Sequence, residues 1–206
     1  MSANKKQYFL KIFKKAEKKY KKTEKRLAGE GWSSDWKTLL ATIMSAQSRD
    51  ETTIPIAESL FKKYSSLESL AKAKYSNVLS ILKSLNYNKT KTKNIIETAR
   101  ILVSEHNSKV PNSIEELTKL PGVGRKTANL VLSEIHEEDT ITVDTHVHRI
   151  SNLLGLVKTK TPDKTELELQ KVVPKKYWSK INRIFVLWGK DVSGRNKNKL
   201  LKKLEE

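Results

Sequence analysis

A lysine and an aspartate stand 18 residues apart in this chain, and together they could perform covalent chemistry. Lys126 lies at the start of a predicted helix, beside the small residues Thr127 and Ala128. A lysine amine that is desolvated, or close to the positive end of a helix, loses its proton more readily and becomes a nucleophile. Asp144 could accept a proton or orient that amine. Alternatively, Lys126 is a phosphate contact or a solvated residue, and Asp144 is only a helix N-cap.

The turn before this lysine has the composition of an anion-binding site. Gly122 and Gly124 flank one valine, so the backbone can adopt positive φ and approach another surface closely. The turn leads into a helix predicted over residues 125–136, whose first N–H groups point outward without helical partners. Such N–H groups suit a phosphodiester. Leu120 and Val123 are expected to pack the flanking helices together. A tight helix–turn–helix connection without a ligand is the alternative.

The composition favours a polyanionic partner and a reducing compartment. The net charge is +18, from 41 Lys and Arg against 23 Asp and Glu, which is typical of nucleic-acid binding. A lysine-rich, very soluble surface is the alternative. Composition does not separate DNA from RNA or an anionic membrane. The chain has no cysteine, which excludes disulfides, thiolate catalysis and cysteine-held metal clusters. With no apolar run of membrane length and no apolar signal core, we expect a cytoplasmic or nucleoid protein without membrane contact.

The elements that must position these residues are predicted to be helices. Apolar residues recur at helical spacing along most of the chain, and strand-like alternation is absent, so the fold class is all-α. Asp35 is expected to cap the second helix, and Pro55 to lie in the first turn of the third. The expected helices cover residues 5–28, 36–47, 52–64, 67–73, 75–85, the stretch from the turn 86–90 to about 106, 114–120, 125–136, 145–155, a helix starting at 161–163, and 174–189.

Six stretches of sequence, taken together, resemble the endonuclease III family of helix-hairpin-helix DNA glycosylases. In family order they are LATIMSAQSRD at 40–50, KNII at 93–96, VP at 110–111, LPGVGRKTAN at 120–129, VDTH at 143–146 and LWG at 187–189. The resemblance covers about three-quarters of the chain, and LPGVGRKTA followed by VDTHV is much longer than a chance motif.

The resemblance implies a role for the lysine and the aspartate. Lys126 would attack the sugar C1′ as a Schiff-base nucleophile while the damaged base leaves. Asp144 would activate the amine and stabilise the oxocarbenium-like state. Family members flip the damaged nucleotide into a cleft between two helical lobes. The resulting imine allows β-elimination and strand cleavage 3′ to the lesion, so the lysine implies a bifunctional glycosylase and lyase.

The resemblance also implies residues that contact DNA. Gln47 would enter the gap left by the flipped base; a polar residue at a helix end is the alternative. Tyr87 falls in the loop where the family places a second wedge, commonly leucine, although an alignment shifted by one residue fits as well. His146 would line the pocket beside Asp144 or serve a structural role. Asp50 would cap or brace a helix, and His148 would be a surface or structural residue. The hairpin contacts would come from Leu120, Gly122, Val123, Gly124, Arg125 and Thr127.

The chain departs from the family at its C-terminal end. Typical members carry four cysteines there, which hold a [4Fe–4S] cluster, and the first would fall near Ser193. Without these cysteines we expect no cofactor and no metal. The DNA contacts of the lost loop would pass to basic residues of the tail; a solvated, partly disordered tail is the alternative. Stability would come from packing around Trp178, Phe185 and Trp188. The basic residues of the tail are Arg195, Lys197, Lys199, Lys202 and Lys203.

We therefore expect two lobes with the site in the cleft between them. One lobe covers residues 29–137 and carries the hairpin; the other combines 1–28 with 138–206 and supplies Asp144. The expected function is release of oxidised pyrimidines from damaged double-stranded DNA by a monomer, followed by strand cleavage. The alternatives are a glycosylase for thymine or uracil opposite guanine, an 8-oxoguanine glycosylase, and a non-catalytic DNA-binding module.

Overall fold

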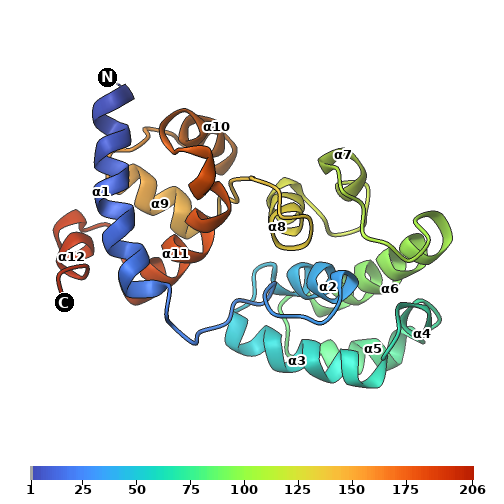
Figure 1. The fold of residues 1–206 in the computed structure, drawn as a ribbon. Helices are drawn as coiled ribbons and strands as arrows, with labels where there is room; N and C mark the ends of the chain where they lie inside the picture. Colours follow the sequence, from blue (N-terminus) through green and yellow to red (C-terminus); the bar gives the residue numbers. More distant parts are fainter. Residues whose placement is uncertain (1) are drawn as a thin grey trace. The chain divides into compact units, whose positions relative to one another are not determined.

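The chain folds into two compact helical units in a computed structural model that describes residues 2–206 (Figure 1). The first unit combines Met1–Lys25 with Glu138–Glu206, and the second unit is Arg26–Glu137. Within the described residues all regular secondary structure is helical, so the predicted all-α class is confirmed. No helix in this part of the chain is long and apolar enough to cross a membrane.

The boundary between the units lies three residues earlier than the sequence indicated. The backbone N–H of Ala28 donates to Asp50 Oδ1 at 3.0 Å, and the Ala28 carbonyl accepts from Trp32 Nε1 at 2.7 Å. Both partners belong to the second unit, so residues 26–28 are part of it rather than of the first. Asp50, the first residue of the third helix, thus braces the segment before the second helix rather than another helix.

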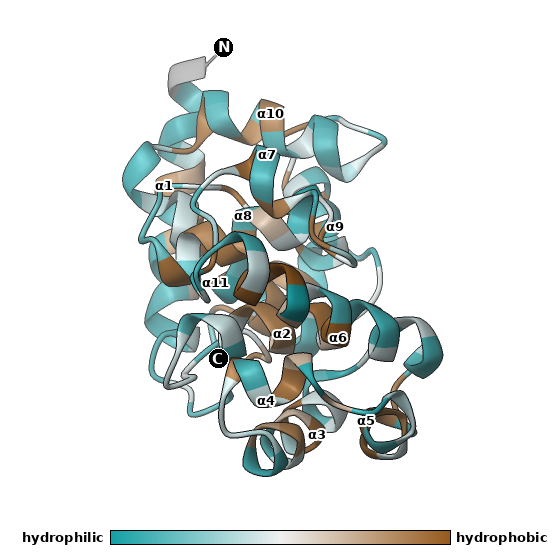
Figure 2. Ribbon diagram, turned by 90° about the vertical axis from the view of Figure 1, so that its right-hand side faces the viewer, coloured by the Kyte–Doolittle hydropathy of each residue, from teal (hydrophilic) through white to brown (hydrophobic). Residues whose placement is uncertain are grey.

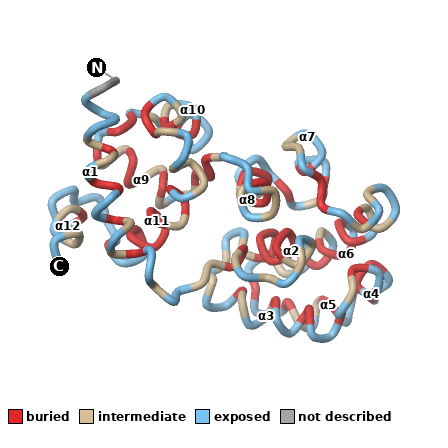
Figure 3. The backbone as a smooth tube through the Cα atoms, in the orientation of Figure 1, coloured by how far each residue is buried: buried red, intermediate tan, exposed pale blue. Residues whose placement is uncertain are grey.

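The second unit, residues 26–137, is built around one apolar helix. Leu39, Leu40 and Met44 of α2 are fully buried, and α2 packs on α3, α6 and α8. This helix is largely brown in Figure 2 and red in Figure 3, because every residue from Thr38 to Met44 is buried and all but the two threonines are apolar. The helices of this unit are α2 (Asp35–Ser45), α3 (Asp50–Lys63), α4 (Leu67–Ala71), α5 (Tyr75–Leu82), α6 (Asn88–Glu105), α7 (Ile114–Leu117) and α8 (Arg125–Ile135).

The first unit has an aromatic core. Phe9 and Phe13 stack with their ring centroids 5.1 Å apart, and Phe185 packs edge-on against Trp188 at 5.8 Å. Phe185 and Trp188 are fully buried and Trp178 is half-buried. The elements of this unit are α1 (Ser2–Tyr20), α9 (Thr145–Leu153), α10 (Pro162–Val172), the 3-10 turn η1 (Lys175–Tyr177), α11 (Trp178–Asp191) and α12 (Lys197–Lys202).

Several expected helix boundaries were wrong, and three of them concern the first three helices. The first helix ends at Tyr20 rather than residue 28, because the polar run 21–26 offers no apolar side chain to bury. Asp35 is the first residue of α2, and Ser34 is its N-cap. Helix α3 begins at Asp50, which moves Pro55 out of the first turn and into the helix, where it removes one backbone hydrogen bond.

The C-terminal tail is folded onto the first unit. Leu200 of α12 is fully buried, and its carbonyl accepts a hydrogen bond from Trp188 Nε1 at 3.2 Å. The guanidinium of Arg149 donates to the carbonyls of Gly189, Val192 and Gly194, which fixes the chain between α11 and α12. The alternative of a partly disordered tail was therefore wrong.

Candidate active site

The predicted hairpin forms as a closed turn between α7 and α8. Val123 N–H donates to the Leu120 carbonyl at 3.1 Å. Leu120 is 3% exposed and Val123 is 6% exposed, and both belong to the core of the second unit. These two side chains therefore hold the helices together, as their apolar character predicted.

The two glycines of the hairpin differ in whether the fold itself requires glycine. Gly122 has φ +82°, and a Cβ there would lie 2.6 Å from Asn94 Nδ2 and 3.1 Å from Ile43 Cγ2. The fold of the hairpin therefore requires glycine at position 122. Gly124 has φ −95°, which other residues adopt readily, and a Cβ there would meet nothing within 4 Å. Gly124 thus leaves open space beside the start of α8.

Helix α6 anchors the hairpin from behind. Asn94 packs against Gly122, and Thr98 Oγ1 donates to the Pro121 carbonyl at 3.1 Å while the Thr98 side chain is fully buried. Sequence reasoning did not assign Asn94 or Thr98 to the site. The only signal was the KNII stretch at 93–96, which matched the family without a stated role.

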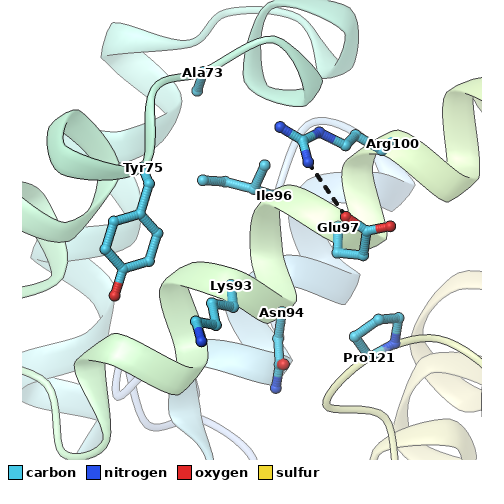
Figure 4. A pocket seen from close by; sticks show the side chains of 8 residues that line it. All are labelled: Ala73, Tyr75, Lys93, Asn94, Ile96, Glu97, Arg100 and Pro121. Atoms are coloured by element: carbon cyan, nitrogen blue, oxygen red, sulfur yellow. Dashed lines mark hydrogen bonds and ion pairs between the residues drawn. The ribbon is translucent and has the colours of Figure 1, made fainter.

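A pocket of about 350 Å³ opens beside this anchor on the second unit. In Figure 4, Asn94 and Pro121 lie on one side of the pocket, and Tyr75 comes from α5. Arg100 and Glu97 form an ion pair at 3.4 Å in its wall. Lys126 is not among the lining residues, so this pocket does not surround the predicted nucleophile. The lining residues are Ala73, Tyr75, Lys93, Asn94, Ile96, Glu97, Arg100 and Pro121.

Lys126 is an exposed residue in the first turn of α8. The hydrogen-bond ladder of this helix starts with Ala128 N–H, which donates to the Gly124 carbonyl at 2.9 Å. The earlier N–H groups lie outside that ladder, at the positive end of the helix. Arg125 is exposed and Thr127 is half-buried beside them. The lysine amine and a set of backbone donors therefore share one helix start.

Asp144 belongs to the first unit and is the N-cap of α9. Its Oδ1 accepts a hydrogen bond from Val147 N–H at 2.8 Å. The segment before it is anchored by Asn182, whose Nδ2 donates to the buried Thr142 carbonyl at 3.2 Å. Burial lowers the pKa of the Arg149 guanidinium, and the Asp144 carboxylate opposes this shift. The capping role is thus visible in the structure, and the catalytic role stays a prediction.

The two histidines near Asp144 make contacts within the first unit. A Cβ on Gly189 would lie 2.8 Å from both Cβ and Cγ of His146, so the imidazole packs directly on α11. His148 Nδ1 lies 2.6 Å from Thr165 Oγ1, which fits its structural interpretation. The place of His146 in a base pocket stays a prediction.

The two predicted wedge residues, Gln47 and Tyr87, lie at neighbouring turns of the second unit. Both are exposed, Tyr87 to 65%. Both have left-handed backbones, with φ of 54° at Gln47 and 56° at Tyr87. Asn86 Nδ2 donates to the Gln47 carbonyl at 2.7 Å, so a hydrogen bond joins turns that are 39 residues apart in sequence.

Comparison with known protein families decides the assignment. Residues 40–175 match the HhH-GPD superfamily of base excision DNA repair proteins. The chain belongs to this superfamily. It is an enzyme of the DNA glycosylase and AP lyase class, and its partner is DNA. The resemblance found in the sequence is thereby confirmed.

Individual members show how far the likeness extends. Endonuclease III of Thermotoga maritima is 44% identical over 157 residues, which are 76% of this chain and 74% of that protein. A trapped endonuclease III–DNA covalent intermediate superposes with a TM-score of 0.84 and 28% identity, over 93% of this chain and 89% of that one. A thermostable thymine-DNA glycosylase superposes with a TM-score of 0.79, over 99% and 97%, but its 18% identity shows the fold alone.

The C-terminal residues of this HhH-GPD protein do not fit a cysteine-held cluster. The chain has no cysteine, and no group of three or more His, Asp or Glu within residues 2–206 could hold a metal ion. Instead, α12 packs on the first unit through Leu200, which is fully buried and whose carbonyl accepts from the fully buried Trp188. Two of the basic tail residues have contacts within this unit: Lys197 donates to the Leu154 carbonyl, and Lys203 pairs with Asp191. Arg195, Lys199 and Lys202 are exposed.

Proposed function

We propose that this chain releases oxidised pyrimidines from damaged double-stranded DNA and then cleaves the strand, acting as a monomer. The observation that carries the proposal is the exposed Lys126 amine at the start of α8, two residues after Gly124. Its setting, directly behind a glycine hairpin in an HhH-GPD protein, supports a nucleophile held against the DNA backbone.

The hairpin would hold one phosphate by its backbone. Gly124 lacks a side chain where the fold does not require glycine, so an anion can approach the first N–H groups of α8 closely. Arg125 and Thr127 lie in the same helical turn. Backbone donors do not read bases, so the grip would position the enzyme without sequence preference.

The Lys126 amine would act on the flipped nucleotide. Its Nζ would form a bond to the sugar C1′ as the bond from C1′ to the base nitrogen breaks, and the base would leave with that electron pair. Asp144 would take the proton that the amine loses and stabilise positive charge on the sugar. The nitrogen lone pair would then break the C1′–O4′ bond, with the proton on Asp144 passing to O4′, and the opened sugar would be a protonated imine. Loss of the C2′ proton would give an enamine, which expels the 3′ phosphate. The solved complex described as a trapped endonuclease III–DNA covalent intermediate supports covalent chemistry in a relative.

Gln47 and Tyr87 would occupy the space that the flipped nucleotide leaves. Flipping costs a few kcal/mol of stacking and pairing energy, and inserted side chains offset part of this cost. Gln47 offers a donor and an acceptor to the unpaired partner base, whereas Tyr87 offers a flat apolar ring. Their exposure and their neighbouring turns support this assignment.

Borohydride trapping tests the proposed nucleophile. Borohydride reduces an imine between the amine and C1′ to a stable covalent bond, so wild-type protein should crosslink to thymine-glycol and abasic duplexes. Lys126→Ala should abolish the crosslink. Lys119→Ala is the matched control, because Lys119 is an exposed lysine just before the hairpin and should crosslink like wild type. Equal crosslinking by Lys126→Ala would refute the assignment.

A lesion panel tests the proposed substrate. Wild type should release thymine glycol faster than thymine or uracil opposite guanine and faster than 8-oxoguanine. Preferential release of a mismatched base would make the chain a mismatch glycosylase, and preferential release of 8-oxoguanine would make it an oxidised-purine enzyme. Salt-dependent DNA binding without base release or nicking would indicate a binding module.

A further inference from the structure

The turns that carry Gln47 and Tyr87 are held in an uncommon backbone conformation. Non-glycine residues seldom adopt φ near +55°, and they keep this conformation only where the surroundings enforce it. The Asn86 amide holds the two turns together by donating to the Gln47 carbonyl at 2.7 Å. Lys91 supplies a second hydrogen bond between the same two turns.

Lys91 contacts both turns at once. Its backbone N–H donates to the Tyr87 carbonyl at 2.9 Å, and its Nζ donates to Ser48 Oγ at 2.8 Å. Ser48 directly follows Gln47, so the lysine links the residue after one wedge to the wedge residue of the other turn. The residue is only 4% exposed, although it lies in the first turn of a helix.

A buried lysine is a poor choice for stability alone. Burial lowers the pKa of the Lys91 amine to about 8, which shows that the protein disfavours its charge. An apolar side chain of similar length would fill the same space without that desolvation cost. The ammonium instead provides a donor that reaches across from α6 to the turn after α2. This placement indicates a positioning role.

The same helix also sets the distance to the hairpin. Asn94 packs against Gly122 and Thr98 binds the Pro121 carbonyl, while Lys91 holds the wedge turns. Along α6, Tyr87 and Asn94 are separated by about 10 Å, at about 1.5 Å per residue. One rigid helix therefore carries both the wedge turns and the support of the phosphate grip.

We propose that Lys91, Ser48 and Asn86 form a wedge bracket that holds Gln47 and Tyr87 ready for insertion into the base stack. The bracket acts through the wedge residues and does not touch the reacting atoms. This inference rests on the proposed function. Because the turns are fixed before DNA arrives, insertion loses little conformational entropy. The bracket should therefore matter when the nucleotide lies in a duplex, and not when the abasic sugar lies in a single strand.

The decisive experiment compares these two situations. Lys91→Met keeps the unbranched apolar stem of the side chain but removes the terminal donor. We expect single-turnover base release from a thymine-glycol duplex to fall about tenfold or more, because wedge geometry is lost. Borohydride trapping on a single-stranded abasic oligonucleotide should stay within about twofold of wild type. Fluorescence of 2-aminopurine opposite an abasic analogue in a duplex reports wedge insertion directly. When protein binds, this fluorescence should rise less with Lys91→Met than with wild type.

Two further variants separate the bracket from folding and from charge. Ser48→Ala removes the acceptor without touching the buried lysine and should give the same pattern as Lys91→Met. Lys89→Met removes an exposed lysine from the same helix and should give neither effect.

The bracket is refuted if duplex release is unchanged in folded Lys91→Met and Ser48→Ala, or if both substrates slow equally. Wild-type protein that neither releases a base nor traps would refute the proposed function. The fluorescence signal would then still show whether the bracket controls insertion.

Discussion

Gly122 and Gly124 show that two glycines in one motif can serve different roles, one in folding and one in ligand binding. Gly122 is enclosed by Asn94 and Ile43 and has positive φ, whereas Gly124 borders open space with an ordinary backbone conformation. Fold and ligand binding therefore impose glycine at different positions of the same turn. This distinction can be tested by a matched pair of alanine substitutions.

Gly122→Ala should destabilise the protein by about 1–3 kcal/mol, because the new Cβ clashes with Asn94 and the backbone is strained. Gly124→Ala should leave the free energy of unfolding within about 0.5 kcal/mol of wild type. It should nevertheless weaken binding to undamaged duplex DNA, because the methyl group obstructs the phosphate. Urea unfolding and fluorescence anisotropy measure the two effects. Normal DNA binding by folded Gly124→Ala would contradict the proposed grip.

The protonation of Lys91 gives a pH-dependent stability. The pKa is about 8 in the folded protein and near 10.5 in the unfolded chain, so the unfolded chain binds the proton more strongly. Stability from this group therefore rises as pH increases from about 8 to 10.5, by at most about 1.4 kcal/mol per pH unit. Urea unfolding of wild type and Lys91→Met across this range should show wild type gaining relative to the variant. A constant difference would contradict the burial of the charge.

At the scale of elements, α12 closes the aromatic core of the first unit. Its contact is carried by Leu200, which is fully buried, and by the hydrogen bond from Trp188. Leu200→Ala should therefore destabilise the protein by about 2–4 kcal/mol. Leu167→Ala is the matched control, since Leu167 of α10 is 52% exposed and should cost less than about 1 kcal/mol. Equal urea midpoints for the two variants would mean that α12 does not stabilise the unit.

Periodicity predicted most of these elements but not all of their ends. The apolar stripe of residues 9–20 gave the first helix, yet the lysine-rich continuation after Tyr20 resembles a solvated helix face and hides its end. The hairpin was predictable because glycine chemistry is local. The roles of Lys91, Asn94 and Thr98 were not, because each depends on a contact with a distant turn.

At the scale of the whole molecule, the predicted nucleophile and its acidic partner belong to different units. Lys126 lies in Arg26–Glu137, whereas Asp144 lies in the segment Glu138–Glu206. Residue chemistry alone left this pair as one possibility among others, and the family resemblance then implied a role for each residue. The geometry within each unit explains how Lys126 meets a helix start and how Asp144 is fixed by its cap.

The charge of the whole chain predicts a steep salt dependence. With a net charge of +18, binding to undamaged duplex should weaken linearly in a plot of log affinity against log salt. Lys119→Ala should lower the slope by no more than about one unit, because it removes at most one phosphate contact. A slope near zero would contradict an electrostatic grip on DNA.

The most direct test of the central claim is to locate the crosslink. Wild-type protein is trapped on thymine-glycol DNA with borohydride, digested with trypsin and analysed by mass spectrometry. A modified Lys126 is not cut, so the DNA remnant should lie on the peptide that begins at Lys126 and ends at Arg149. A remnant on any other lysine, or base release without a crosslink, would contradict the account.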